Sequence, residues 1–422
     1  MKQKSHFFFS GILLGIAIVY LLTRSSYPGF GDSIGFLLFA ERGFDLATNA
    51  TSHFLYTNVN HLALVLFPQA NPVSVLVGVS LVFSLFCIIF TYKYITLISK
   101  DTIKTLTPLL IFALSFTWWR QSVIVEVYTF YCFWIITSLY LMLKDILNEQ
   151  HKYAIPIAAL LGLGTLTHIQ TILFFPLLGW YFLSVKNISK KSIFFSVMVL
   201  ILVTSPLIVL PLWLKSHNLS AVFFDNQYRG TVLSLNLGDL IKGTFRSLGY
   251  LIYNFHIFTI FIIRGTLIAW KENRKLFWFS LIAAGPVWFF AMRYNVSDNY
   301  VFFLVPYMVL TGLGSLGLKN FGECIHRKFL PAFILVAFFL SPTIYWTTWK
   351  IAEQIESLAV WAAPKTYKGG LKYYLWPGQE TSADPLELAK KIYTGEISPI
   401  DDFERYPVAI EYLKEKGEIN EN

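Results

Sequence analysis

Charged residues are scarce in this sequence. Asp, Glu, Lys and Arg make up 14% of its 422 residues, whereas a soluble globular protein carries about 25%. Apolar side chains make up 55%, and several apolar runs approach the roughly 20 residues that a helix needs to cross a bilayer. This composition excludes an ordinary soluble protein and predicts an all-α polytopic membrane protein.

Cysteine is scarce too. The three cysteines, Cys87, Cys132 and Cys324, lie far apart in or near apolar runs, so neither a disulfide framework nor a metal-binding motif is visible. No acidic cluster has the spacing of metal ligands, and we expect no obligatory structural metal. No internal repeat is evident, which disfavours transporters built from duplicated halves. The net charge of +9 is spread in short clusters between apolar runs, which indicates membrane topology rather than nucleic-acid binding.

The lengths of the apolar runs and the charged breaks between them predict about eleven spans. They lie near residues 6–23, 74–98, 104–118, 123–144, 153–168, 170–185, 192–214, 250–270, 276–293, 299–318 and 329–349. The first run has the basic start and apolar core of a signal peptide, but "SSYPGF" after it is a poor small-x-small cleavage site. We therefore expect a first transmembrane helix there.

Lysine and arginine distinguish the two sides of the membrane. With the N-terminus in the cytoplasm, every inner segment is short and rich in these residues, as the positive-inside rule favours. The extracytoplasmic side then holds two long loops, 24–73 and 215–249, and the C-terminus. We expect a transmembrane domain, residues 1–349, and a small extracytoplasmic segment, residues 350–422. In the latter, "PLELAKKIY" and "YPVAIEYLKEKG" are typical of short amphipathic helices.

Polar residues that are unusual in a membrane protein fall near the outer face in this topology. They are Asp32, His53, His61, Arg120, Gln121, Glu126, His168, Tyr294 and Asp298. Ionisable groups within or beside apolar runs are costly, and they commonly mark either a membrane boundary or a functional site. Their convergence on one face favours a functional site there.

Structural roles stay open for most of these residues. Asp32 could cap the helix of "SIGFLLFAERG", Arg120 could extend its charged end to lipid headgroups, and Asp298 has the context of an ordinary turn residue. The histidines could be surface or turn residues. Glu126 is harder to explain in this way, because we expect it about one turn inside the fourth span, where a carboxylate needs a partner.

An acidic residue at an outer membrane face, with basic and aromatic neighbours, suits sugar transfer from a lipid. The polyprenyl tail of a lipid-linked sugar lies in the bilayer and its phosphate at the surface. The acceptor hydroxyl that attacks the anomeric carbon must lose a proton, which a carboxylate such as Asp32 can accept. Arg or His side chains can neutralise the departing phosphate. Composition permits this chemistry without selecting it.

Four segments resemble the motifs of one family. They are "GDSIGF", with Asp32 and Ser33; "FTWWRQSVIVEVYTF", with Trp119, Gln121, Glu126, Val127 and Tyr128; "GLGTLTHIQTILFFP", with Gly162, His168 and Pro176; and "YNVSDNYVFFLVP", with Tyr294, Asp298 and Pro306. In this order, from about residue 31 to residue 318, they resemble the motifs of multi-pass membrane proteins related to the protein O-mannosyltransferases. Gly35 stands where that family has a second acidic residue, and "SHFLYTN" stands where it has a His-Pro-Pro-Gly-Tyr-Pro stretch.

The resemblance implies a class C glycosyltransferase (GT-C-like) bundle whose first outer loop carries the catalytic acid. It implies a polyprenyl-phosphate-linked sugar donor. Membrane lipid and an acceptor protein or glycan are the other expected partners, but the resemblance does not carry over the identity of the acceptor. Asp32 becomes the expected general base. The expected lining of the donor or acceptor site is His53, His61, Arg120, Gln121, Glu126, Tyr128, His168, Tyr294 and Asp298. A divalent cation at the donor phosphate stays an open alternative.

Two other functions stay open. A transporter or flippase for a lipid or glycolipid would place its coupling charges near the midplane on broken helices, whereas the candidate charges here gather near one face. The second alternative is a non-catalytic scaffold of the same fold, since the first-loop motif is altered at Gly35 and around His53.

Overall fold

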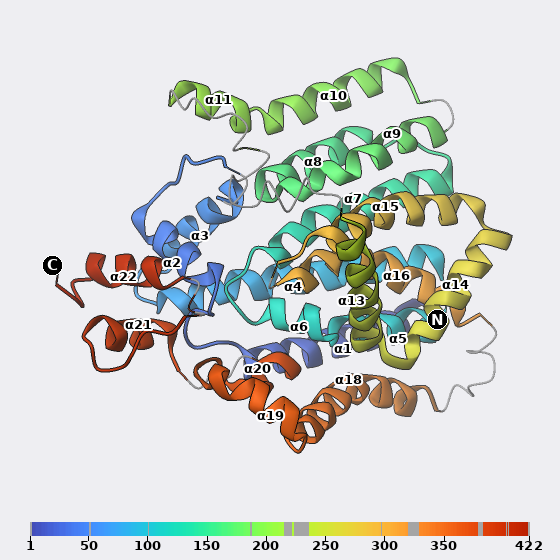
Figure 1. The fold of residues 1–422 in the computed structure, drawn as a ribbon. Helices are drawn as coiled ribbons and strands as arrows, with labels where there is room; N and C mark the ends of the chain where they lie inside the picture. Colours follow the sequence, from blue (N-terminus) through green and yellow to red (C-terminus); the bar gives the residue numbers. More distant parts are fainter. Residues whose placement is uncertain are drawn as a thin grey trace.

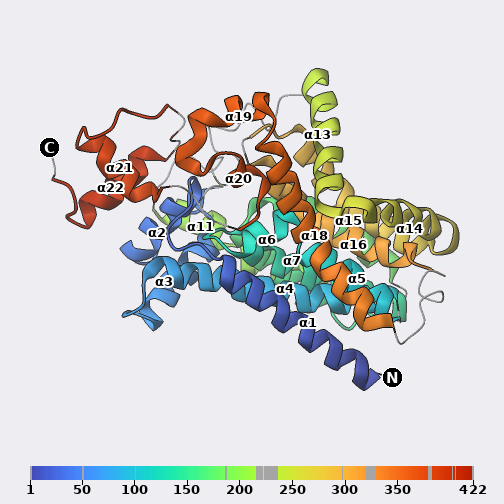
Figure 2. The same cartoon turned by 90° about the horizontal axis from the view of Figure 1, so that it is seen from below.

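The computed structural model describes residues 2–49, 52–99, 101–185, 188–214, 222, 236–296, 298–319, 329–378, 383–401, 403 and 405–420. Throughout this part of the chain the regular secondary structure is helical, and it contains no strand. The helices pack into one bundle, and the two chain ends lie at opposite sides of it in both views (Figures 1 and 2). The predicted fold class, an all-α polytopic membrane protein, is confirmed.

Each of the predicted apolar segments overlaps a helix. The bundle contains α1 (Lys2–Thr23), α4 (Pro72–Ile98), α5 (Thr102–Ala113), α6 (Phe116–Ser122), α7 (Tyr128–Asn148), α8 (Ala154–Thr167), η1 (Ile169–Phe174), α9 (Phe175–Ser184), α10 (Lys190–Thr204), α11 (Pro206–Trp213), α13 (Leu237–Phe255), η3 (His256–Phe258), α14 (Thr259–Glu272), α15 (Arg274–Arg293), η4 (Asn299–Phe303), α16 (Leu304–Gly317) and α18 (Leu330–Ala352). Among the described residues, seven helical segments are long and apolar enough to cross a membrane: Pro72–Ile98, Tyr128–Asn148, Lys190–Trp213, Leu237–Glu272, Arg274–Arg293, Asn299–Gly317 and Pro331–Ala352. The other predicted spans correspond to shorter apolar helices, so the number of spans stays a prediction.

Shorter helices lie in the first outer loop and in the C-terminal segment. The loop contains α2 (Asp32–Arg42) and α3 (Phe54–Leu66), and the segment contains α19 (Glu356–Ala362), η6 (Ala363–Lys368), α20 (Gly370–Leu375), α21 (Pro385–Tyr393) and α22 (Tyr406–Glu415). The last two coincide with the predicted amphipathic helices. In the predicted loop 215–249, residues 215–221 and 223–235 lie outside the described part of the chain.

Helix α13 begins inside that predicted loop. Asn236 caps it by accepting a hydrogen bond from the Gly238 N–H at 2.8 Å. Its exposed apolar residues recur every three or four positions and are Leu237, Ile241, Phe245, Leu248 and Ile252. Charged residues lie between them, so the helix is amphipathic and lacks the continuous apolar run that marks a span. This is why hydropathy predicts its start too late.

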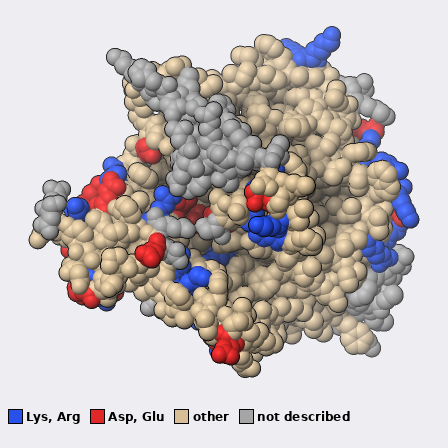
Figure 3. Space-filling view, in the orientation of Figure 1, with Lys and Arg blue, Asp and Glu red and all other residues tan. Residues whose placement is uncertain are grey.

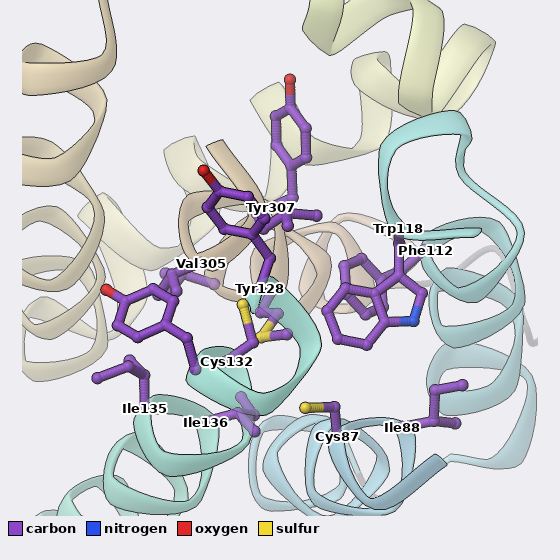
Figure 4. Packing of buried hydrophobic residues seen from close by; sticks show 14 of the residues in the cluster. Cys87, Ile88, Phe112, Trp118, Tyr128, Cys132, Ile135, Ile136, Val305 and Tyr307 are labelled. Carbon is purple, nitrogen blue, oxygen red and sulfur yellow. The ribbon is translucent and has the colours of Figure 1, made fainter. Parts of the chain in front are cut away.

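The core of the bundle is rich in aromatic side chains where α4, α5, α6 and α7 meet (Figure 4). The ring centroids of Phe112 and Trp118 lie 4.9 Å apart. Cys87 and Cys132 are buried free thiols in the same cluster, as expected for cysteines in apolar runs. Because lipid tails are as apolar as these side chains, close packing rather than transfer from water holds such helices together.

Charged residues gather at two sides of the molecule. In Figure 3 they cluster around α21 and α22 and again along the opposite edge, a few more lie near the middle of this face, and the described surface between the middle and that opposite edge is largely uncharged. A charge inside the hydrocarbon core is costly, so a membrane-spanning body needs such an uncharged band. The band supports insertion of the bundle with the C-terminal segment at one membrane face.

Candidate functional site

A cavity of about 1350 Å³ lies where the first outer loop, the C-terminal segment and several helix ends meet. It is lined by nine of the ten predicted site residues: Asp32, His53, Arg120, Gln121, Glu126, Tyr128, His168, Tyr294 and Asp298. The fold therefore brings together segments that are far apart in the sequence. His61 is not among the lining residues. Its Nδ1 lies 2.8 Å from the carbonyl oxygen of Ala40, and its ring packs on Phe44.

Asp32 enters the cavity wall from the start of α2. The preceding Gly31 has a φ of 126° and a ψ of −143°, a conformation that glycine adopts far more readily than other residues. The Ser33 hydroxyl donates to the carbonyl oxygen of Val125 at 2.8 Å, which fixes this turn on the α6–α7 connection. Asp32 is the first residue of α2 and not its cap. Instead, its carboxylate accepts a hydrogen bond from the guanidinium of Arg405.

Glu126 lies in the connection between α6 and α7 and not one turn inside a span, because α7 begins only at Tyr128. Besides the Ser33 bond to Val125, two hydrogen bonds from distant residues hold this connection: the Ser25 N–H donates to the Val123 carbonyl at 2.8 Å, and the Ser80 hydroxyl donates to the Glu126 carbonyl at 3.2 Å. These partners satisfy backbone groups that a helix would otherwise pair. Neither partner is local in sequence, which is why the apolar pattern alone predicts an earlier helix start.

The carboxyl group of Glu126 is partly buried among other acidic groups. Burial raises its pKa well above the usual value, and the charges of Asp32 and Asp298 raise it further. The Val127 N–H and the charge of Arg405 act in the opposite direction. Glu126 therefore retains its proton to higher pH than a solvated glutamate does.

Replacing Glu126 with Gln is expected to weaken the dependence of stability on pH. The folded protein keeps this proton above the pKa of the unfolded chain, 4.5, so unfolding releases a proton in that window. The stability of the wild type therefore falls as the pH rises from about 5 toward the raised pKa, by at most about 1.4 kcal/mol per pH unit. Thermal midpoints of the solubilised protein between pH 5 and pH 8 measure this slope.

Glu387 provides the matched control. It is an exposed residue of α21, and its hydrogen bond with Lys391 lowers its pKa, so Glu387→Gln should leave the decline between pH 5 and pH 8 in place. A slope that is the same in the wild type and in Glu126→Gln would contradict the raised pKa.

Two histidines at the cavity wall lie with their ring centroids 5.0 Å apart. His53 Nδ1 lies 3.0 Å from the Thr167 carbonyl oxygen, which only accepts, so Nδ1 carries the proton of the neutral ring and Nε2 is an acceptor. Burial lowers the pKa of His53, which favours that neutral ring. The Gln170 N–H donates to His168 Nδ1 at 3.2 Å, so the neutral His168 carries its proton on Nε2. The pair thus offers one acceptor and one donor.

Arg120 and Gln121 lie on α6. Arg120 is 4% exposed; it donates to the Tyr373 carbonyl and lies over the Tyr373 ring, 4.2 Å from its centroid. It therefore ties α20 to the bundle rather than extending to lipid headgroups. Gln121 is 2% exposed, and its Oε1 has no hydrogen-bond partner among the described residues. A buried acceptor of this kind beside a cavity is available to a ligand.

Tyr294 and Asp298 belong to the turn between α15 and η4. The Asn299 amide donates to the Ala291 carbonyl at 2.7 Å and to the Tyr294 carbonyl, which closes this turn. The Tyr294 ring packs edge-on against Phe302, with centroids 5.1 Å apart. Asp298 is therefore a turn residue that also lines the cavity.

The cavity has further lining residues that the motifs do not predict. The basic and aromatic ones among them include Arg246, Lys368, Tyr373, Tyr374 and Arg405. The stretch "KGGLKYYLW" combines basic and aromatic residues, and this is the signal that could have indicated Lys368 and the two tyrosines. Nothing in the sequence around Arg405 distinguishes it from other basic residues of the C-terminal segment.

The charges at the cavity suit an anion. Arg120, Arg246, Lys368 and Arg405 line it together with the carboxyl groups of Asp32, Glu126 and Asp298. Arginine and lysine are effective partners of phosphate oxygens. Within the described ranges, no group of three or more His, Cys, Asp or Glu is placed to hold a metal ion. A divalent cation at a donor phosphate therefore stays a prediction.

Comparison with known proteins agrees with the motif resemblance. Residues 50–192 match the model of the family described as the N-terminal domain of the protein O-mannosyl-transferase TMEM260. No curated protein matches the chain in sequence. Among solved structures, the chain is similar to the Archaeoglobus fulgidus oligosaccharyltransferase, crystallised in complex with Zn and sulfate, at 13% identity and a TM-score of 0.49.

That similarity covers 95% of this chain but 57% of the oligosaccharyltransferase chain, so this protein spans little more than half the length of that neighbour. The family match includes two of the four motifs, those around Glu126 and His168. With the multi-pass helical architecture described above, it agrees with the predicted resemblance: residues 50–192 of this membrane protein are similar to the N-terminal domain of a protein O-mannosyl-transferase family.

Proposed function

We propose that the protein is a membrane glycosyltransferase that moves a sugar from a polyprenyl-phosphate-linked donor to an acceptor hydroxyl, with Asp32 as the general base. The observation that carries this proposal is the gathering of nine predicted residues around one cavity, from the first outer loop and from three segments far from it in sequence. An unrelated use of the fold would not require a carboxylate, paired histidines and several cations to face the same space. The family match supports the reaction class, and mannose is the first sugar to test.

The reaction forms one bond and breaks one. The acceptor oxygen bonds to the anomeric carbon, the bond from that carbon to the phosphate oxygen breaks, and its electron pair leaves with the polyprenyl phosphate. The proton of the acceptor hydroxyl passes to the carboxylate of Asp32. The charge that develops on the phosphate is stabilised by cations such as Arg120 and Lys368 and by the Nε2 proton of His168.

Two buried amides are suited to bind the hydroxyl groups of a sugar. Gln121 Oε1 and Gln170 Nε2 are buried, have no hydrogen-bond partner among the described residues, and belong to side chains that line the cavity. A site built to bond a hydroxyl discriminates strongly, because its polar groups stay unpaired with the wrong ligand. We assign Gln121 and Gln170 to sugar recognition.

Replacing Gln121 with Leu is expected to raise the KM for the donor about tenfold, or ~1.4 kcal/mol of lost binding. Because Oε1 has no partner within the described protein, the apolar substitute should not lower the thermal midpoint. Steady-state transfer and thermal melting, measured on the same preparation, separate the two effects. Gln150→Leu is the control, since Gln150 is exposed and does not line the cavity. An unchanged KM would remove Gln121 from sugar recognition.

The topology assigned to the proposed enzyme places the cavity at the extracytoplasmic face. The N-terminus is cytoplasmic and the C-terminal segment extracytoplasmic, as the distribution of lysine and arginine favours. A donor whose lipid tail stays in the bilayer then presents its phosphate and sugar to the cavity, where the acceptor protein or glycan arrives from solution. A cysteine introduced at the exposed residue Glu411 would test the orientation. In intact cells it should react with a membrane-impermeant reagent.

Reconstitution tests the proposed function. Purified protein in proteoliposomes that contain polyprenyl-phosphate mannose is expected to transfer labelled sugar to an added acceptor mixture, and a nucleotide sugar is expected not to replace the donor. Movement of the intact labelled lipid between leaflets without transfer would instead indicate a flippase. A preparation that still binds polyprenyl phosphate but shows neither sugar transfer nor movement of the lipid would indicate a scaffold.

A further inference from the structure

The C-terminal segment is docked on the helix that carries Asp32. Ile34 of α2 is fully buried in a cluster with apolar residues of the segment, including Phe403 and Leu413. Both views show α22 beside α2 (Figures 1 and 2). The docking therefore does not depend on ion pairs alone, and a change of one charged residue should leave α22 in place.

Ion pairs line the edge of this contact. Arg42 of α2 pairs with Glu411 and Glu415 of α22, and Lys416 Nζ lies 2.8 Å from Glu41 Oε2. These pairs lie outside the cavity wall, and the Arg42 pairs are exposed to solvent. Exposed pairs of this kind contribute little to stability.

The Arg405–Asp32 pair differs from the others because both partners line the cavity. Arg405 directly precedes α22, and its side chain is 38% exposed, while that of Asp32 is 44% exposed. Both charged groups are thus accessible from the cavity, and a ligand there can compete for either. Lys368 of the same segment also lines this space.

This pair poses a chemical problem for the proposed reaction. The carboxylate oxygen Oδ1 of Asp32 accepts the hydrogen bond of the Arg405 guanidinium, so this oxygen is not available to an acceptor hydroxyl while that bond is in place. The phosphodiester of a lipid-linked sugar is itself an anion, and arginine binds phosphate oxygens as well as carboxylates. A donor phosphate in the cavity therefore gives Arg405 an alternative partner.

Building on the proposed function, we propose that Arg405 is shared between Asp32 and the donor phosphate. In the empty site it holds Asp32; when the polyprenyl-phosphate sugar enters, it turns to the phosphate and releases the carboxylate to act as the base. The C-terminal segment is then part of the active site, and it links the availability of the Asp32 carboxylate to the presence of the donor.

Binding of a short-chain polyprenyl monophosphate to the full-length protein in nanodiscs tests this inference. Arg405→Gln should weaken binding at least tenfold, and Arg405→Lys, which keeps the charge, should weaken it less. Asp32→Asn should strengthen binding several-fold, because it removes the carboxylate that competes with the phosphate for Arg405. The gain from Asp32→Asn should be smaller in the double variant that also carries Arg405→Gln, because the arginine responsible for the gain is then absent.

Arg42→Gln is the matched control, because Arg42 pairs across the same interface but does not line the cavity. It should bind the probe as the wild type does. If Arg42→Gln and Arg405→Gln weaken binding of the probe equally, Arg405 acts only in docking the segment and the inference is overturned. Wild-type binding by Arg405→Gln, or weaker binding by Asp32→Asn, would also overturn it.

The proposed function and this inference can fail separately. If the wild type transfers sugar and Arg405→Gln has an unchanged KM for the donor, the function stands and the sharing of Arg405 falls. If the variants show the expected binding pattern but the wild type transfers no sugar, Arg405 is a phosphate ligand shared with Asp32 and the glycosyltransferase function falls.

Discussion

Asp32→Asn is expected to abolish sugar transfer while the protein stays folded. Asparagine has the shape of aspartate but cannot accept the proton of the acceptor hydroxyl, and loss of a general base lowers a rate by about 10²–10⁴-fold. The Gly31 turn and the Ser33 hydrogen bond that place residue 32 do not involve the carboxylate. Initial rates of transfer from polyprenyl-phosphate sugar, with size-exclusion profiles as a check on folding, measure the effect.

A second acidic residue of the first outer loop serves as the control. Asp45 accepts the Ala47 N–H at 2.8 Å and does not line the cavity, so Asp45→Asn should transfer sugar at close to the wild-type rate. Undiminished transfer by Asp32→Asn would remove Asp32 from the mechanism. Equal losses in both variants would mean that the loop needs its acidic residues for structure rather than for chemistry.

Substitution of Gly265 or Gly317 by valine is expected to prevent folding. A Cβ at Gly265 on α14 would lie 1.8 Å from the Leu313 carbonyl oxygen, and one at Gly317 on α16 would lie 1.9 Å from the Phe261 carbonyl oxygen. The opposing atoms are backbone, so the two helices would have to separate. Small residues permit such close approach in membrane bundles, and the expected cost is about 3 kcal/mol or more.

Fluorescence-detected size-exclusion of the solubilised variants measures this loss. Gly78→Ala on α4 is the control, because a Cβ there meets no atom within 4 Å, and alanine is the better helix former by up to about 1 kcal/mol. Monodisperse Gly265→Val and Gly317→Val proteins with wild-type melting temperatures would contradict the packing of α14 on α16.

The sequence predicts the helices well because the membrane simplifies the problem. Run length and charged breaks suffice to locate segments whose backbone must pair internally, and every predicted span overlaps a helix. The errors occur where contacts distant in sequence decide a boundary. Ser25 and Ser80 hold the connection that contains Glu126 out of the following helix, and the amphipathic α13 lacks the continuous run that hydropathy detects.

The motifs predict the cavity residues that lie on the bundle and the first outer loop, but they miss those of the C-terminal segment. The motifs identify Asp32, Glu126 and His168. The fold places these residues at one cavity because they lie at neighbouring helix ends. Arg405 and Lys368 join them only through the docking of α22 and the chain around α20, and no local pattern records that docking. The motif residue Gly162 has a different role, since a Cβ there would meet Val203 of α10 at 2.8 Å, so it allows helix packing.

The most direct test of the central claim is the stoichiometry of one turnover. Purified protein in proteoliposomes, supplied with polyprenyl-phosphate sugar labelled in both the sugar and the lipid, should release one polyprenyl phosphate for each sugar that becomes bound to the acceptor. Asp32→Asn should release neither product above background. Labelled sugar that remains attached to its lipid while the lipid changes leaflet would contradict a glycosyltransferase at this cavity.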